Sequence, residues 1–135
     1  METTRAVYLG GLRTEVTHLQ SGVKIITDAP SDNQGKGEAF SPTDLFAASY
    51  GCCALTIIGI TAQVHGFNIE GAEVKTTKVM GTNPRRIIEL VVEFIFPGSY
   101  TDKERKFIEL AVKECPVANT IDSAMTLTKT FTYKG

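Results

Sequence analysis

The stretch SPTDLFAASYGCCALTIIGITAQV, residues 41–64, decides the fold, because residues 45–64 carry no formal charge at all. Its first residues predict a helix start. The Ser41 hydroxyl can accept a hydrogen bond from an otherwise unpaired backbone N–H, and Pro42 suits the first helical position because it has no N–H to leave unpaired. Asp44 stands where a capping box usually has Glu or Gln. We therefore expect a long helix over this stretch.

Twenty uncharged residues are also enough to span a bilayer. The run lacks flanking clusters of basic residues, and polar side chains interrupt it at Ser49, Thr56, Thr61 and Gln63. We therefore expect a buried core helix that ends at Gly66, and no membrane partner. A helix that is apolar on every side needs more cover than 135 residues easily provide. This predicts that a partner subunit buries part of the helix.

The remaining pattern is mostly that of strands. Alternation and turn signals predict strands over 12–17, 23–27, 70–80, 86–96 and 126–133, with an exposed connection over 28–40. A capping box, Thr101-x-x-Glu104, predicts a second helix, and a short helix is expected from Pro116. This order of elements favours an α+β fold over a parallel βαβ sheet, and the length predicts a single domain over 1–135.

Composition excludes several classes of function. The chain has 14 basic and 15 acidic residues, so it lacks the positive field that nucleic acid would require. Residues 1–12 lack the pattern of a signal peptide, which predicts a cytoplasmic protein. Thiols are kept reduced in the cytoplasm, and paired cysteines there more often serve catalysis or metal binding than act as staples.

Two of the three cysteines stand in unusual places. Cys53 lies in the middle of the uncharged helix, and Cys115 directly precedes a proline. As the N-cap of a short helix, Cys115 would have its pKa lowered by the helix dipole, whereas Cys53 becomes a nucleophile only if a cation reaches it. The residues alone therefore favour Cys115 as the more acidic thiol. Cys52 points to another side of the helix and is expected to pack in the core.

Two other interpretations of the cysteines remain open. All three can be small apolar core residues, since free cysteine is among the most buried residue types. Metal binding is less favoured, because the sequence has no C-x-x-C or H-x-x-x-H pair and His18 and His65 are isolated.

The stretch Ser41–Cys53, followed some sixty residues later by Cys115-Pro116-Val117-Ala118-Asn119, resembles the OsmC/Ohr family of osmotically inducible protein C and organic hydroperoxide resistance proteins. The resemblance extends over nearly the whole chain and suggests a divergent OsmC-like branch. It implies an α+β fold in which antiparallel sheets wrap around long buried central helices in an intertwined homodimer. An active site would lie at each subunit junction, with no cofactor and no metal.

The resemblance also implies roles for both thiols. Cys53 takes the place of the cysteine that attacks the peroxide, and Cys115 that of the resolving cysteine. The cycle would pass through a Cys53 sulfenic acid and a Cys53–Cys115 disulfide, which an external dithiol reduces.

Family members activate the attacking thiolate with an arginine that a glutamate holds. Arg13 is the natural candidate for the arginine, with Arg5 as the alternative. The glutamate is where this chain departs from the family, since its position is occupied by Thr43. If Asp44 serves the helix cap, Glu38 is the better partner for Arg13.

These observations favour a thiol-dependent peroxidase that reduces organic hydroperoxides, an oxidoreductase of the oxidative stress response. The substrate is expected to be apolar, because the helix around Cys53 is apolar. The competing interpretation is a non-enzymatic protein that binds a small apolar ligand at the dimer interface.

Overall fold

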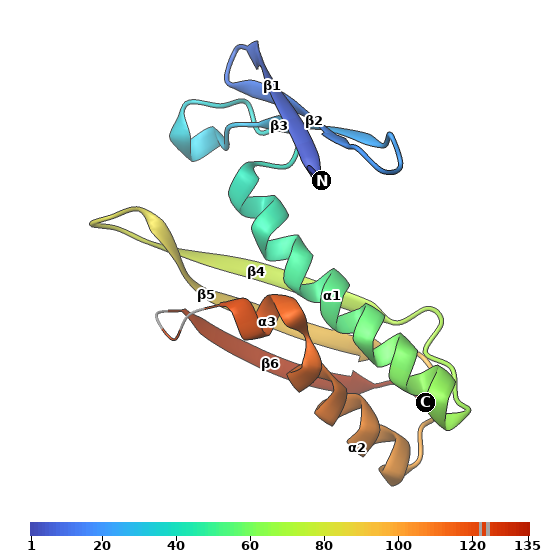
Figure 1. The fold of residues 1–135 in the computed structure, drawn as a ribbon. Coiled ribbons are helices and arrows are strands. Elements are labelled where there is room, and N and C mark those ends of the chain that lie inside the picture. The colour runs from blue at the N-terminus through green and yellow to red at the C-terminus, as the bar shows by residue number, and fades with distance from the viewer. Residues whose placement is uncertain (122, 124) are drawn as a thin grey trace. The chain divides into compact units, whose positions relative to one another are not determined.

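The computed structural model describes residues 1–121, 123 and 125–135. It divides into two compact units, residues 1–46 and 47–135. The expectation of a single domain over 1–135 stays a prediction. The elements in chain order (Figure 1) are β1 (Thr4–Gly10), β2 (Arg13–His18), β3 (Lys24–Asp28), η1 (Ser31–Asn33), α1 (Pro42–His65), β4 (Glu73–Gly81), β5 (Arg86–Phe96), α2 (Asp102–Ala111), η2 (Val112–Glu114), α3 (Pro116–Thr120) and β6 (Thr126–Tyr133).

The first unit is built on an antiparallel sheet of order β1-β2-β3. The sequence predicted β2 and β3 within one residue at each end but missed β1, whose residues do not alternate between polar and apolar. Apolar side chains of the sheet are exposed, among them Val7, Leu9, Ile25 and Ile26. The buried residues described in this unit are polar: Thr27, Asp28 and Ser41. The unit on its own therefore leaves apolar sheet surface without cover.

Helix α1 begins with the predicted capping box. The Ser41 hydroxyl accepts a hydrogen bond from the Asp44 backbone N–H at 3.1 Å, and the Asp44 carboxylate accepts one from the Ser41 N–H at 3.0 Å. The helix ends at His65, and Gly66 follows it with a φ of +75°, the left-handed conformation that glycine adopts easily. Asp44 is thus committed to the cap, as the sequence analysis expected.

One stripe of α1 is buried, formed by residues three or four apart: Ala47, Tyr50, Gly51, Ala54, Ile58 and Ala62. Residues on other sides, such as Ile60 and Val64, are exposed. By length and composition the helix could cross a membrane, with 33% of its most apolar window buried, but the core helix of a soluble protein has the same properties. The chain alone therefore covers one side of an apolar helix.

The second unit contains a sheet of order β4-β5-β6. Strands β4 and β5 form an antiparallel hairpin, whereas β6 runs parallel to β5, a pairing that the order of elements did not indicate. Alternate residues of β5 are fully buried on the face that α1 and α2 cover (Figure 1): Leu90, Val92, Phe94 and Phe96. The predicted α+β class is confirmed, and the second capping box forms between Thr101 and Glu104.

Gly51 lies where α1 packs closely against β4. A Cβ added at Gly51 would stand 2.9 Å from Val74 Cγ1 and 3.0 Å from Cγ2. Alanine normally stabilises a helix interior by about 1 kcal/mol over glycine, whereas overpacking costs about 1–3 kcal/mol. We expect Gly51→Ala to lower the free energy of unfolding by up to about 2 kcal/mol in urea titrations, the overpacking cost less the gain in helix propensity.

A double-mutant cycle with Val74→Ala tests this cause, because Val74→Ala removes both methyl groups that the new Cβ would meet. The double variant should lose less stability than the sum of the two single variants. A stabilising Gly51→Ala, or strictly additive effects, would contradict the packing described.

Candidate functional site

Cys53 lies midway along α1, at the edge of the buried stripe. Its side chain is half-buried and packs against the core of the second unit. Helix periodicity fixes this place, because at 3.6 residues per turn Cys53 is turned about 60° from Tyr50, on the side away from Ala54 and the rest of the stripe. The thiol therefore has one side against the core.

Cys115 is the N-cap of α3, as the sequence analysis expected. Its backbone is extended, Pro116 occupies the first helical turn, and the sulfur accepts a hydrogen bond from the Ala118 backbone N–H at 3.5 Å. The preceding turn η2 carries Cys115 into the core, where it is fully buried. The cap thus fixes the position of a thiol that solvent cannot reach.

The structure brings the two thiols together. The side chains of Cys53 and Cys115 are hydrogen-bonded to each other, and both cysteines are in the free, reduced form. Neighbouring thiols can be oxidised to a disulfide and reduced again by thiol–disulfide exchange. Two residues that are 62 positions apart in the sequence therefore form a potential redox pair within the second unit.

The expected acidity of Cys115 is wrong in direction. Burial raises the pKa of the Cys115 thiol, the Ala118 N–H lowers it, and the hydrogen bond with Cys53 raises it again. The net result is a raised pKa, because burial in a core disfavours the charged form and the following helix has only five residues. Cys115 is thus held as a protonated thiol at neutral pH.

The prediction for Cys52 is also wrong for the chain by itself. Its side chain is exposed and does not pack in the core. The cause is the helix periodicity, which turns Cys52 away from the stripe that β5 and α2 cover.

Arg13 lies in the first unit, between two carboxylates. Its Nη2 atom is 3.4 Å from Asp28 Oδ2 and 3.3 Å from Glu38 Oε1. Glu38 is therefore a partner of Arg13, as the sequence analysis expected. Arg5 instead forms an exposed ion pair with Glu2, at 2.6 Å.

Asp28 is the residue of this cluster that the sequence analysis missed. Its side chain is only 1% exposed, and its Oδ2 atom also accepts a hydrogen bond from the Glu38 backbone N–H at 3.1 Å. That hydrogen bond is the main cause that lowers the pKa of Asp28, and the charge of Arg13 lowers it further. Asp28 therefore stays ionised and ties Arg13 to the loop that carries Glu38.

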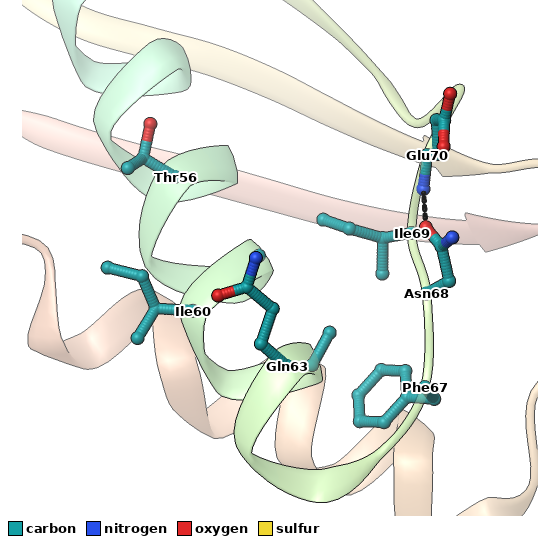
Figure 2. A pocket seen from close by; sticks show the side chains of 9 residues that line it. Thr56, Ile60, Gln63, Phe67, Asn68, Ile69 and Glu70 are labelled. Carbon is teal, nitrogen blue, oxygen red and sulfur yellow. Dashed lines mark hydrogen bonds between the residues drawn. The ribbon is translucent and has the colours of Figure 1, made fainter.

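The second unit also has a pocket of about 490 Å³ between α1 and the segment that follows it. Figure 2 shows the Thr56, Ile60 and Gln63 side chains on the helix opposite Asn68 and Ile69. The pocket does not include either thiol of the pair. Among the described residues, no group of three or more His, Cys, Asp or Glu side chains could hold a metal ion.

Comparisons with known proteins agree with this fold. A protein from Psychrobacter arcticus, described as a candidate osmotic stress induced and detoxification response protein, is 46% identical, and its crystal structure has a TM-score of 0.93 over 97% of this chain and 96% of that chain. The crystal structure of an organic hydroperoxide resistance protein from Legionella pneumophila has a TM-score of 0.77 at 21% identity over 98% of both chains. At that identity the likeness shows the fold alone.

Sequence comparison identifies the family of the chain. An uncharacterized protein of Acinetobacter baylyi is 29% identical over 119 residues, which are 87% of this chain and 83% of that protein. The model of the family described as OsmC-like protein matches residues 35–129, which include both thiols of the pair as well as Glu38. Since that match covers well over half of the sequence, the chain belongs to the OsmC-like protein family.

Proposed function

We propose that this protein is a thiol-dependent peroxidase that reduces organic hydroperoxides. The observation that carries the proposal is the hydrogen-bonded pair of a half-buried Cys53 and a buried Cys115. Membership of the OsmC-like family supports it, since a relative with the same fold bears the name organic hydroperoxide resistance protein.

In the proposed cycle the Cys53 thiolate attacks the terminal oxygen of the hydroperoxide. The O–O bond breaks, the alkoxide takes up a proton and leaves as an alcohol, and Cys53 becomes a sulfenic acid. The Cys115 thiol then condenses with the sulfenic acid, which forms the disulfide and releases water. An external dithiol reduces the disulfide to the two thiols by exchange, and we propose a cytoplasmic location because reductants of this kind are abundant there.

The active protein is proposed to be a homodimer with an apolar substrate. Two exposed apolar surfaces support a dimer, because a second copy of the chain would bury them. They are the apolar side chains on the sheet of the first unit and the exposed apolar side of α1. Burial of such surface is the main driving force of association.

The proposal assigns Arg13 to the activation of the Cys53 thiolate. Its support is the way in which the first unit holds the guanidinium between Asp28 and Glu38, with the guanidinium still about one third exposed. Because Asp28 is buried and Glu38 is exposed, Asp28 is the stronger anchor.

The assignment of the two thiols predicts different defects. We expect Cys53→Ser to reduce the consumption of cumene hydroperoxide to the uncatalysed background, because no attacking sulfur remains. Cys115→Ser should still oxidise once and accumulate a Cys53 sulfenic acid, which dimedone labelling followed by peptide mass spectrometry detects.

Wild-type protein treated with one equivalent of peroxide should yield the Cys53–Cys115 disulfide, and Cys52→Ser serves as the matched control. Equal peroxide consumption by wild type and Cys53→Ser would reject the proposal.

The arginine cluster predicts a ranking of rates. A hydrogen bond to a charged group is worth about 1.5–3 kcal/mol, so Arg13→Ala should lower kcat/KM by about 10- to 100-fold. Asp28→Asn should have a larger effect than Glu38→Gln, since an exposed ion pair contributes about 0–1 kcal/mol. Arg5→Ala is the matched control and should behave as wild type. A defect in Arg5→Ala with normal activity in Arg13→Ala would reverse the assignment.

One observation favours the alternative of a non-enzymatic binding protein, namely the pocket beside Thr56 and Phe67. Polar side chains such as Gln63 and Asn68 also line it, which suits an amphipathic ligand better than a purely apolar one. We expect fatty acids to raise the Tm of protein with alkylated thiols by less than 1 °C, a shift too small for specific binding. A large, saturable increase in Tm that alkylation leaves unchanged would favour binding as the function.

A further inference from the structure

The Tyr50 hydroxyl is a buried polar group without a role in the fold. The side chain is 0% exposed, and its hydroxyl has no hydrogen-bond partner among the residues that the structure describes. Buried hydroxyl groups are nearly always paired, because an unpaired one loses its hydrogen bonds to water and gains none in return. Phenylalanine would fill the same space without this loss.

Both thiols belong to the core in which Tyr50 is buried, since Cys115 is part of the same cluster and Cys53 packs against it. Tyr50 lies one helical turn before Cys53 on α1, and its pKa is raised to about 12 by burial first and then by the charges that Cys115 and Cys53 can carry. At neutral pH the phenol is therefore protonated, and it is a hydrogen-bond donor.

The reduced pair offers this donor little. A neutral thiol is only a weak acceptor, whereas a thiolate is charged, and hydrogen bonds to charged acceptors are about twice as strong as neutral ones. The Tyr50 hydroxyl is thus a donor suited to a thiolate, a charge that the reduced pair does not carry while both thiols are protonated. Of the two sulfurs, the buried Cys115 is the one held in its protonated form.

We propose that Tyr50 is a positioning residue of the thiol pair, whose hydroxyl donates a hydrogen bond to the Cys53 sulfur when that sulfur is a thiolate. The inference deepens the proposed function, on which its catalytic meaning rests. The titratable groups that the structure couples to this hydroxyl are Cys53 on the same helix and Cys115 from the junction of η2 and α3.

The test is the rate at which iodoacetamide alkylates Cys53, measured by peptide mass spectrometry between pH 5 and pH 10. Only the thiolate reacts, so the rate follows the stability of the anion. In Tyr50→Phe we expect the rate at pH 7 to fall about tenfold and the pH of half-maximal rate to rise by about one unit. An unchanged profile would overturn the proposal.

A second measurement separates this role from a structural one. If the hydroxyl has no partner in the reduced protein, Tyr50→Phe should unfold at the same or a higher urea concentration than wild type. A Tyr50→Phe variant that unfolds at lower urea, with unchanged alkylation, would show a structural role and overturn the proposal. Loosened packing would expose Cys53 and speed its alkylation, so a slower reaction supports the proposal even in a less stable variant.

Tyr100 is the matched control, because its hydroxyl donates to the Asn68 backbone carbonyl at 3.2 Å. Tyr100→Phe should show the opposite pattern, with slightly lower stability and unchanged alkylation of Cys53. The assay contains no peroxide, so it remains decisive if wild type fails to consume hydroperoxides. In that case the peroxidase proposal fails, while a slower alkylation in Tyr50→Phe still assigns the hydroxyl to the thiolate.

Discussion

The packing of one narrow stripe of α1 against the sheet is the constraint on which the second unit depends. Small residues on this stripe, Gly51 above all, let the helix approach until the Val74 methyl groups fill the place of the missing Cβ. This close approach fixes the angle of the helix about its axis, and with it the direction of every side chain that the helix carries. Cys53 reaches Cys115, and Cys52 does not, because of that angle.

Features of the fold that depend on local sequence were predictable, and those that depend on distant partners were not. The caps at Ser41 and Thr101 are local, since each residue bonds the backbone three positions on, and both formed as predicted. Strand β1 was missed because its apolar residues do not alternate. The parallel pairing of β6 with β5 was not foreseen, because nothing in either strand specifies the direction of its partner.

The candidate site shows the same division. The family resemblance implied an acidic partner for Arg13, and Glu38 was the acidic residue left near the helix start, whereas the sequence placed Asp28 at the beginning of an exposed loop. Asp28 is buried because the chain comes back beside it at Phe40, whose backbone carbonyl accepts a hydrogen bond from the Asp28 N–H. The pKa of Cys115 was misjudged for a related reason. The helix dipole can be inferred from the sequence, but the burial that outweighs it comes from tertiary packing.

The unequal exposure of the two sulfurs has a consequence for the order of events. Cys53 is within reach of molecules in solution, whereas Cys115 is enclosed. In the proposed cycle a dissolved oxidant can therefore collide with one sulfur only, and the other reacts after oxygen has been delivered to its neighbour. Such seclusion would also spare the enclosed sulfur from sulfinic and sulfonic acids, which form irreversibly when a thiol meets excess oxidant. The unequal burial of the two sulfurs would then determine which of them is oxidised first.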